Sequence, residues 1–316
     1  MPVSVIPTKI IIPKRPGGVL RRPRLTDYLH ENLERKLMLV TAPAGYGKTT
    51  LLIDFAQDVE MPVCWYTLDE GDRDLAVFLT HLVASLQRHF PQFGQHTRPL
   101  IDNGVPAATT AAAALVADMV SDIPEYFVLV LDDWHLVSDE SPIRELIDHV
   151  LRYLPEHAHL IVAGRTLLRG PLIRLAAQGA VAGIGAADLR FTGDEVREVL
   201  SSRFNLSISA EQAARFALEA EGWITAILLT SSSVWQDVLG RLAQVRDSAG
   251  ALYEYLASEV FDRIDAALQD FLLTSAVPRQ FTAELCGELG TRGAAAEWIE
   301  QVEARNLFLI QLEDAG

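Results

Sequence analysis

The sequence predicts an α/β fold, with a parallel sheet covered by helices on both faces, followed by a mostly helical C-terminal part. Up to about residue 189, short apolar runs alternate with segments of helical periodicity, as in strand–helix–strand units. One of these runs, residues 126–131 (YFVLVL), is apolar throughout, as expected of a parallel strand buried on both faces. After Leu189 the pattern becomes mostly helical.

The composition is that of a globular chain with an acidic surface. The chain has 316 residues, 49% of them apolar, and a net charge of −15, which allows two or three domains and opposes binding to DNA by this segment alone. No apolar run approaches the ~20 residues of a membrane span, and the N-terminus has no signal-peptide pattern. We therefore expect a cytoplasmic location, no membrane partner, and free buried thiols at Cys64 and Cys286.

The first 190 residues supply the elements of the sheet domain. Residues 8–12 (TKIII) predict a short strand or an extended arm, and residues 25–33 a helix. Further strands are expected at 37–40, 63–68, 126–131 and 160–163, and further helices from Lys48 and at 74–90, 107–123 and 142–154. Residues 91–106 are rich in Pro, Gly and Asn and predict a loop.

The C-terminal part predicts two small domains. Thr192 with Glu195, and Ser209 with Gln212, form capping-box patterns that open two helices. Helices are also expected at 224–239 and between 252 and 302, and residues 307–312 (LFLIQL) predict a final strand. Helices followed by a strand are typical of a winged helix, and this strand lacks a partner, so we expect a winged helix cut at its wing. The predicted domains are 1–190 (nucleotide binding, with an N-terminal arm), 191–245 (helical lid) and 246–316 (winged helix).

The stretch around which the chain is organised is residues 37–55, LMLVTAPAGYGKTTLLIDF. A buried strand leads into a small-residue loop, and a helix opens at Lys48, so backbone N–H groups and the helix N-terminus can hold phosphate. Gly45 and Gly47 allow a close approach of the backbone. The phosphate-loop pattern begins with Gly, whereas this chain has Ala42, which is strained only if that position needs a positive φ. This pattern predicts a nucleotide site.

Acidic residues at the ends of strands extend this site. Lys48 can reach the outer phosphates, and the Thr49 hydroxyl can bind Mg²⁺. Asp132 follows a buried strand, where an acid can hold the same metal ion. Asp133 can orient or deprotonate the attacking water. The carboxyl ends of the strands are therefore the expected place of the ligand.

Three basic features leave alternatives open. Arg165, after the strand at 160–163, can stabilise γ-phosphate charge or be an ordinary surface arginine. The basic residues between Lys9 and Arg24 can form a solvated arm or touch the nucleotide. His135 follows the paired aspartates, and a lone histidine is more often a bystander than a ligand.

Together these motifs resemble a known family. RRPRL (21–25), APAGYGKTT (42–50), WYTLDEGD (65–72), VLVLDDWH (128–135) and EGWITAILL (221–229) resemble the MalT-like group of STAND regulators, the signal-transduction ATPases with numerous domains. FLLTSAV (271–277) and EARNLFLIQLED (303–314) are similar to the winged-helix region of that group. The group commonly has Ala at the position of Ala42. It often has Pro shortly after the Trp at position 223, where this chain has Ile224 and Thr225, so this chain departs from the group where the lid contacts adenine.

The resemblance implies roles for individual residues. It implies that Thr49 and Asp132 bind Mg²⁺, that Asp133 activates water, and that Arg165 senses the γ-phosphate. Residues expected to bind ATP or ADP are Arg22 (near base and sugar), Ala44, Gly45, Tyr46, Gly47, Lys48, Thr49 and Thr50. The segment around Trp223 matches the helical domain that closes over the nucleotide.

The resemblance also implies a mode of action. The chain would be the N-terminal part of a LuxR-type, ATP-dependent transcriptional activator, in which ADP holds the module closed and ATP plus an inducer leads to self-association. ATP hydrolysis would then be slow and would reset the state. The inducer would act through a sensor domain that this chain lacks. A P-loop NTPase whose turnover is itself the function, and a nucleotide binder without hydrolysis, are the alternatives.

Overall fold

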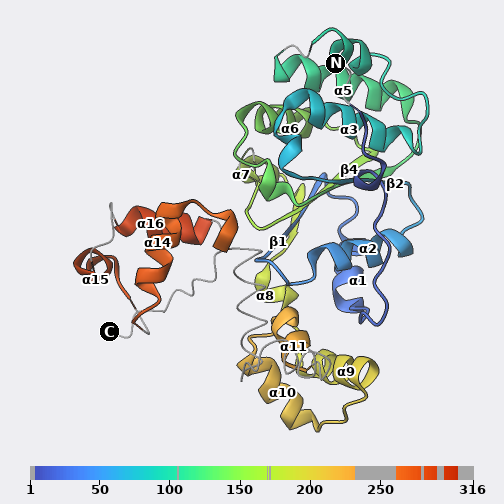
Figure 1. Ribbon diagram of the computed structural model, residues 1–316. Coiled ribbons are helices and arrows are strands. Elements are labelled where there is room, and N and C mark those ends of the chain that lie inside the picture. The colour runs from blue at the N-terminus through green and yellow to red at the C-terminus, as the bar shows by residue number, and fades with distance from the viewer. Residues whose placement is uncertain are drawn as a thin grey trace. The chain divides into compact units, whose positions relative to one another are not determined.

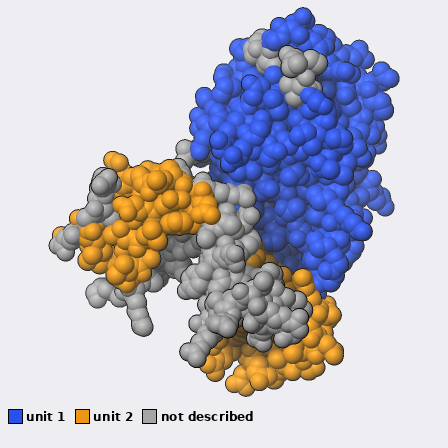
Figure 2. Space-filling view, in the orientation of Figure 1, with its two compact units in different colours: residues 1–42, 47–189 blue, residues 43–46, 190–316 orange. Residues whose placement is uncertain are grey.

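The computed structural model describes residues 4–104, 107–168, 170, 172–231, 261–278, 281–289 and 295–304. Its internal contacts divide the chain into two compact units, which Figure 2 shows in blue and orange. The first unit comprises residues 1–42 and 47–189, and the second comprises residues 43–46 and 190–316. The division into three domains at 190 and 245 is finer than this one and stays a prediction.

The first unit is built on a five-stranded sheet (Figure 1). The strands are β1 (Leu37–Thr41), β2 (Val63–Thr67), β3 (Phe127–Asp132), β4 (Ala158–Gly164) and β5 (Val181–Ile184). Their order is β2-β3-β4-β1-β5, and every neighbouring pair is parallel. The predicted α/β fold with a parallel sheet is therefore confirmed.

Helices connect the strands of this unit. They are α1 (Pro23–Glu31), α2 (Lys48–Asp58), α3 (Leu75–Gln87), α4 (Thr97–Asp102), α5 (Ala108–Asp122), α6 (Ser141–Tyr153), α7 (Leu172–Ala177) and α8 (Ala186–Leu189). Three short 3-10 helices accompany them: η1 (Pro7–Lys9), η2 (Glu70–Arg73) and η3 (Trp134–Leu136). Across the described parts of both units, we find no helix with the length and apolar character that a membrane span requires.

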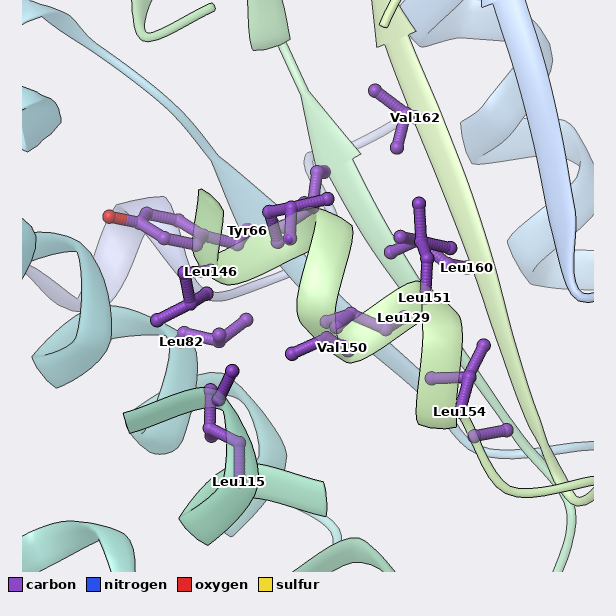
Figure 3. Packing of buried hydrophobic residues seen from close by; sticks show 14 of the residues in the cluster. Tyr66, Leu82, Leu115, Leu129, Leu146, Val150, Leu151, Leu154, Leu160 and Val162 are labelled. Atoms are coloured by element: carbon purple, nitrogen blue, oxygen red, sulfur yellow. The ribbon is translucent and has the colours of Figure 1, made fainter. Parts of the chain in front are cut away.

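One face of the sheet carries the larger core. Alternate residues of each strand point into it, such as Leu129 and Leu131 of β3 and Leu160 and Val162 of β4. They meet buried side chains of α3, α5 and α6, including Leu82, Leu115 and Leu146 (Figure 3). The residues between them, such as Val130 and Ile161, are also fully buried, on the opposite face. Burial on both faces explains why these strands are apolar throughout.

Two predictions for the first unit need correction, the strand alternative at residues 8–12 and the loop at 91–106. Residues 8–12 form no strand: the 3-10 helix η1 starts at Pro7 instead, and Lys9 is buried with its ammonium 2.8 Å from Asp72. The expected loop at 91–106 contains α4. The buried carboxylate of Asp118 accepts hydrogen bonds from the backbone N–H of Thr97 (2.9 Å) and from its hydroxyl (2.6 Å), and so organises the start of this helix. That partner is 21 residues away, which is why local composition misled.

The N-terminal arm lies on the first unit through its basic residues. Arg15 pairs with the buried Asp54 of α2, and Arg21 lies 2.9 Å from Asp58 at the end of the same helix. Both arginines are therefore paired with carboxylates of the sheet unit, Arg15 in a mostly buried position and Arg21 at the surface.

The second unit is helical in its described parts. Its helices are α9 (Gly193–Phe204), α10 (Ala210–Glu219), α11 (Ile224–Ser231), η4 (Phe261–Arg263), α14 (Ala266–Ser275), α15 (Ala283–Glu288) and α16 (Ala295–Ala304). Both predicted capping boxes are present, at Thr192–Glu195 and at Ser209–Gln212. The expected strand at 307–312 and the end of the helix expected at 224–239 lie outside the described residues.

Candidate functional site

Helix α2 begins directly after a glycine in the left-handed conformation. Gly47 has φ 81° and ψ 25°, and a Cβ there would meet nothing within 4 Å, so the backbone angle rather than space requires glycine. Gly47 occupies the N-cap position and offers no capping side chain to the first N–H groups of the helix. Such a helix start attracts an anion through its N–H groups and its dipole.

Lys48, the first residue of α2, is a buried cation. Its side chain is 7% exposed, and its ammonium donates a hydrogen bond of 2.8 Å to the carbonyl oxygen of Ala42. Burial lowers the pKa of Lys48 to about 8; Asp133 and Asp132 act in the opposite direction, and Arg165 adds to the lowering. A polyanionic ligand beside this ammonium would raise its pKa again, so the position suits phosphate.

Thr49 and Asp132 bring two oxygen atoms together. The Thr49 hydroxyl donates a hydrogen bond of 2.8 Å to Oδ2 of Asp132, which is fully buried at the end of β3. The other oxygen of Asp132 accepts the backbone N–H of Asp133 at 3.0 Å. Burial raises the pKa of Asp132, and the charge of Asp133 raises it further.

This oxygen pair fits Mg²⁺ that arrives with a nucleotide. Mg²⁺ prefers one or two carboxylate or hydroxyl oxygens, together with phosphate oxygens and water. Among the described residues, no group of three or more His, Cys, Asp or Glu side chains could hold a metal ion. The residues here therefore fit a metal shared with phosphates rather than one held by the protein alone.

Asp133 differs sharply from its neighbour. Its backbone is left-handed, with φ 59° and ψ 35°, and its side chain is 41% exposed. This conformation is uncommon for residues other than glycine and turns the chain into η3. The imidazole Nδ1 of His135 lies 3.9 Å from the Asp133 carboxylate. A solvent-accessible carboxylate beside a buried one is suited to contact water.

Arg165 follows β4, the strand that lies between β1 and β3. Its guanidinium is close enough to influence the pKa of Lys48. The structure thus brings the end of β4 to the same edge of the sheet as Lys48, Thr49 and Asp132.

Arg22 lies at the N-cap of α1 and is buried, with 6% of its surface exposed. Its Nη2 donates a hydrogen bond of 2.9 Å to the carbonyl oxygen of Leu189. Thr50 lies in the first turn of α2 and is half-buried. This hydrogen bond fixes the Arg22 side chain within the first unit, and its expected contact with the base and sugar stays a prediction.

The middle of the loop, residues 43–46, packs within the second unit. Tyr46 is buried beside Arg190 and Glu221, and burial raises the pKa of its hydroxyl. Trp223 Nε1 donates a hydrogen bond of 3.0 Å to the carbonyl oxygen of Ala44, and the Thr225 hydroxyl donates one of 3.0 Å to that of Gly45. Sequence reasoning placed Trp223 in a lid but did not connect it or Thr225 to this loop.

The first unit has the architecture of a P-loop NTPase. A solved structure with this fold is that of a Walker-type ATPase from Pyrococcus abyssi, which superposes with a TM-score of 0.60 at 15% identity, covering 93% of this chain and 92% of that one. At this level of identity the likeness shows the fold.

Comparison with related sequences shows which proteins with this fold the chain resembles. The HTH-type transcriptional regulators MalT of two Klebsiella pneumoniae strains are each 29% identical to this chain over 316 residues, which is 99% of this chain and 35% of the relative. Residues 257–316 match the family described as the MalT winged helix domain. This chain is therefore homologous to the N-terminal region of MalT and spans about a third of the length of these relatives. The predicted resemblance to MalT-like STAND proteins, with a winged helix, is confirmed.

Proposed function

We propose that this chain binds ATP and ADP at the phosphate loop and the adjoining strand ends. The observation that carries the proposal is the buried ammonium of Lys48 at the start of α2, beside the Thr49–Asp132 oxygen pair. Removing the charge of a lysine from water is costly, and phosphate oxygens beside this ammonium would offset that cost. The P-loop fold supports the same ligand class.

Each side chain then has a distinct task. Lys48 would hold the outer phosphates, Thr49 and Asp132 would hold Mg²⁺, and the bound metal would neutralise charge on the β- and γ-phosphates. Asp133, the exposed carboxylate, would orient or deprotonate the attacking water. Arg165 would stabilise charge on the γ-phosphate. Hydrolysis would be slow, because its task is to reset a state rather than to supply product.

The homology to MalT supports a regulatory role for this site. We infer that the chain is the nucleotide-binding module of a signal-responsive transcriptional regulator, closed with ADP and self-associating with ATP and an inducer. A sensor for the inducer would lie in the two thirds of the MalT length to which this chain does not correspond.

Specific DNA binding would also lie outside this segment. The net charge of −15 opposes the phosphate backbone of DNA. Within the described winged-helix residues, α14 and α16 contain no Lys or Arg, whereas α16 alone carries Glu297, Glu300 and Glu303. A mobility-shift assay on random duplexes at physiological salt, with ADP and with ATP, should enrich no sequence.

The test is to identify the nucleotide that co-purifies with the protein, and then to measure ATP and ADP binding by titration calorimetry. Lys48→Ala should weaken binding by about 10- to 150-fold, because charge-assisted hydrogen bonds contribute about 1.5–3 kcal/mol each. The exposed Lys14→Ala variant is the matched control and should bind like the wild type. Equal affinity in Lys48→Ala would refute the site. If no nucleotide co-purifies and the protein hydrolyses ATP rapidly, a stand-alone NTPase is favoured over a regulatory switch.

A further inference from the structure

Two side chains from the start of α11 donate to two consecutive carbonyl groups of the phosphate loop. Trp223 Nε1 is 3.0 Å from the carbonyl oxygen of Ala44, and Thr225 Oγ1 is 3.0 Å from that of Gly45. These donors are 179 and 180 residues away from their acceptors in the sequence. All four residues belong to the second unit.

These two bonds determine where the N–H groups of the loop point. The peptide unit is planar, and none of the described peptide bonds is cis, so each carbonyl points opposite to the N–H of the next residue. Holding the Ala44 carbonyl toward Trp223 therefore directs the N–H of Gly45 away from it. In the same way, the bond from Thr225 directs the N–H of Tyr46 away from α11. Phosphate loops bind their ligand with backbone N–H groups.

The two donors follow a tight turn that is held by backbone hydrogen bonds. Glu221 and Gly222 both have positive φ, 49° and 65°, and reverse the chain between α10 and α11. The carbonyl oxygen of Gly222 accepts the N–H of Phe191 at 2.8 Å, and its own N–H bonds to Ala217 at 2.7 Å. A Cβ at Gly222 would lie 2.6 Å from that of Arg190, so no larger residue fits. Side chains fixed in this way can hold a partner to a narrow geometry.

The phosphate loop also leaves no space for a side chain at Gly45. Gly45 has φ 77°, and a Cβ there would lie 2.7 Å from Trp223 Nε1 and closer still to the Thr225 hydroxyl. Ala44 and Tyr46, on either side of it, are both buried. The peptides that follow Ala44 and Gly45 are thus held by contacts as well as by hydrogen bonds.

We propose that Trp223 and Thr225 are positioning residues for the phosphate loop, which aim the N–H groups of Gly45 and Tyr46 at the phosphates of ATP or ADP. By doing so they slow the release of the nucleotide. This inference rests on the proposed function, because it assumes that the loop binds phosphate.

The experiment measures the dissociation rate of a fluorescent ADP analogue by stopped-flow, with excess ADP as competitor. Thr225→Val keeps the shape but removes the hydroxyl, and should release the analogue about three to ten times faster, as expected for one lost hydrogen bond. Thr225→Ser restores the donor and should release it at the wild-type rate. Trp223→Phe keeps an aromatic ring without the N–H, and should also accelerate release.

Matched controls separate positioning from a general loss of stability. Thr274→Val removes a hydroxyl that donates to the Asp270 carbonyl of α14, and Trp298→Phe changes the Trp that stacks on Phe271. Both controls should release the analogue at the wild-type rate. Urea unfolding of each variant shows whether it is folded, and Trp223→Phe provides the answer if Thr225→Val does not fold.

The outcomes distinguish this inference from the proposed function. If Lys48→Ala binds the analogue more weakly than the wild type, but Thr225→Val and Trp223→Phe match the wild type, the positioning role is refuted while nucleotide binding stands. If Thr225→Ser is as fast as Thr225→Val, the hydroxyl is not the cause and the inference also fails. If the wild type binds no nucleotide, both proposals fall.

Discussion

The two units hold themselves together in different ways. In the first, the strands pair residues that are far apart in the sequence, such as Leu37 with Leu160 on one side and with Val181 on the other. In the second, α9 and α10 each begin with a capping box formed by residues three positions apart. Figure 2 shows the two units in different colours.

This difference decides where unusual chemistry can arise. Lys48 and Asp132 have shifted pKa values because the non-local sheet and its helices remove them from water. The carboxylates of α9 and α10, such as Asp194 and Glu219, are exposed. The sheet unit therefore holds Lys48 and Asp132, whereas the helical unit holds Trp223 and Thr225, which donate to its own loop residues Ala44 and Gly45.

The largest effect is expected on hydrolysis. Asp133→Asn keeps the shape of the side chain but removes its basicity, so ATP hydrolysis should fall by about 10²- to 10⁴-fold while ATP binding persists. Asp194→Asn, an exposed carboxylate of the helical unit, is the control and should hydrolyse ATP like the wild type. Phosphate release and calorimetry measure the two quantities, and normal hydrolysis by Asp133→Asn would remove this residue from the proposed site.

The next effect compares one substitution in the two units. Leu146→Ala removes a fully buried side chain of α6 and should lower the free energy of unfolding by about 2–5 kcal/mol. Leu218→Ala in α10, where the leucine is 78% exposed, should change it by less than about 0.5 kcal/mol. Urea unfolding of both variants is the measurement. If both variants lose a similar free energy of unfolding, the Leu218 side chain must be buried in solution, contrary to its exposure in the structure.

A third effect concerns pH and Lys48. Its folded-state pKa, about 8, is below the unfolded value of 10.5. Between these values the unfolded chain binds more protons, so the stability of the ligand-free protein should rise with pH across this window, by about 3 kcal/mol in total.

Lys48→Met removes this titration. It should be more stable than the wild type at pH 7, and the difference should shrink from pH 8 to pH 10. The exposed Lys14→Met variant controls for other groups that titrate in the same range. The free energy of unfolding is measured with urea, without nucleotide, at each pH. If it changes with pH in the same way for the wild type and Lys48→Met, the predicted contribution of Lys48 is wrong.

The smallest effect tests the local character of the helical unit. Thr192→Ala removes one hydroxyl acceptor of a capping box and should destabilise α9 by about 1 kcal/mol. Thr192→Ser keeps the acceptor and should be close to neutral. Hydrogen exchange of α9 amides should detect the change while the amides of β3 keep their protection. Equal loss of protection in β3 would show that the two units unfold together.

Local sequence patterns predict many elements of this protein. The strands at 37–40 and 126–131, the helix that opens at Lys48 and the two capping boxes all follow from local patterns, because apolar periodicity and caps depend on neighbours in the chain. The phosphate-loop motif and the paired Asp132 and Asp133 are equally local, and the set of such motifs along the chain carries the resemblance to MalT-like proteins.

Other features arise only when distant segments of the chain pack together. Strand β5 has four residues and pairs with β1 across a large sequence distance, and α4 depends on the distant Asp118. The burial that lowers the pKa of Lys48, and the bonds from Trp223 and Thr225 to the loop, likewise join residues that no local pattern connects. These features depend on which segments come together when the chain folds, because the burial and partners of a side chain are set by elements distant in the sequence.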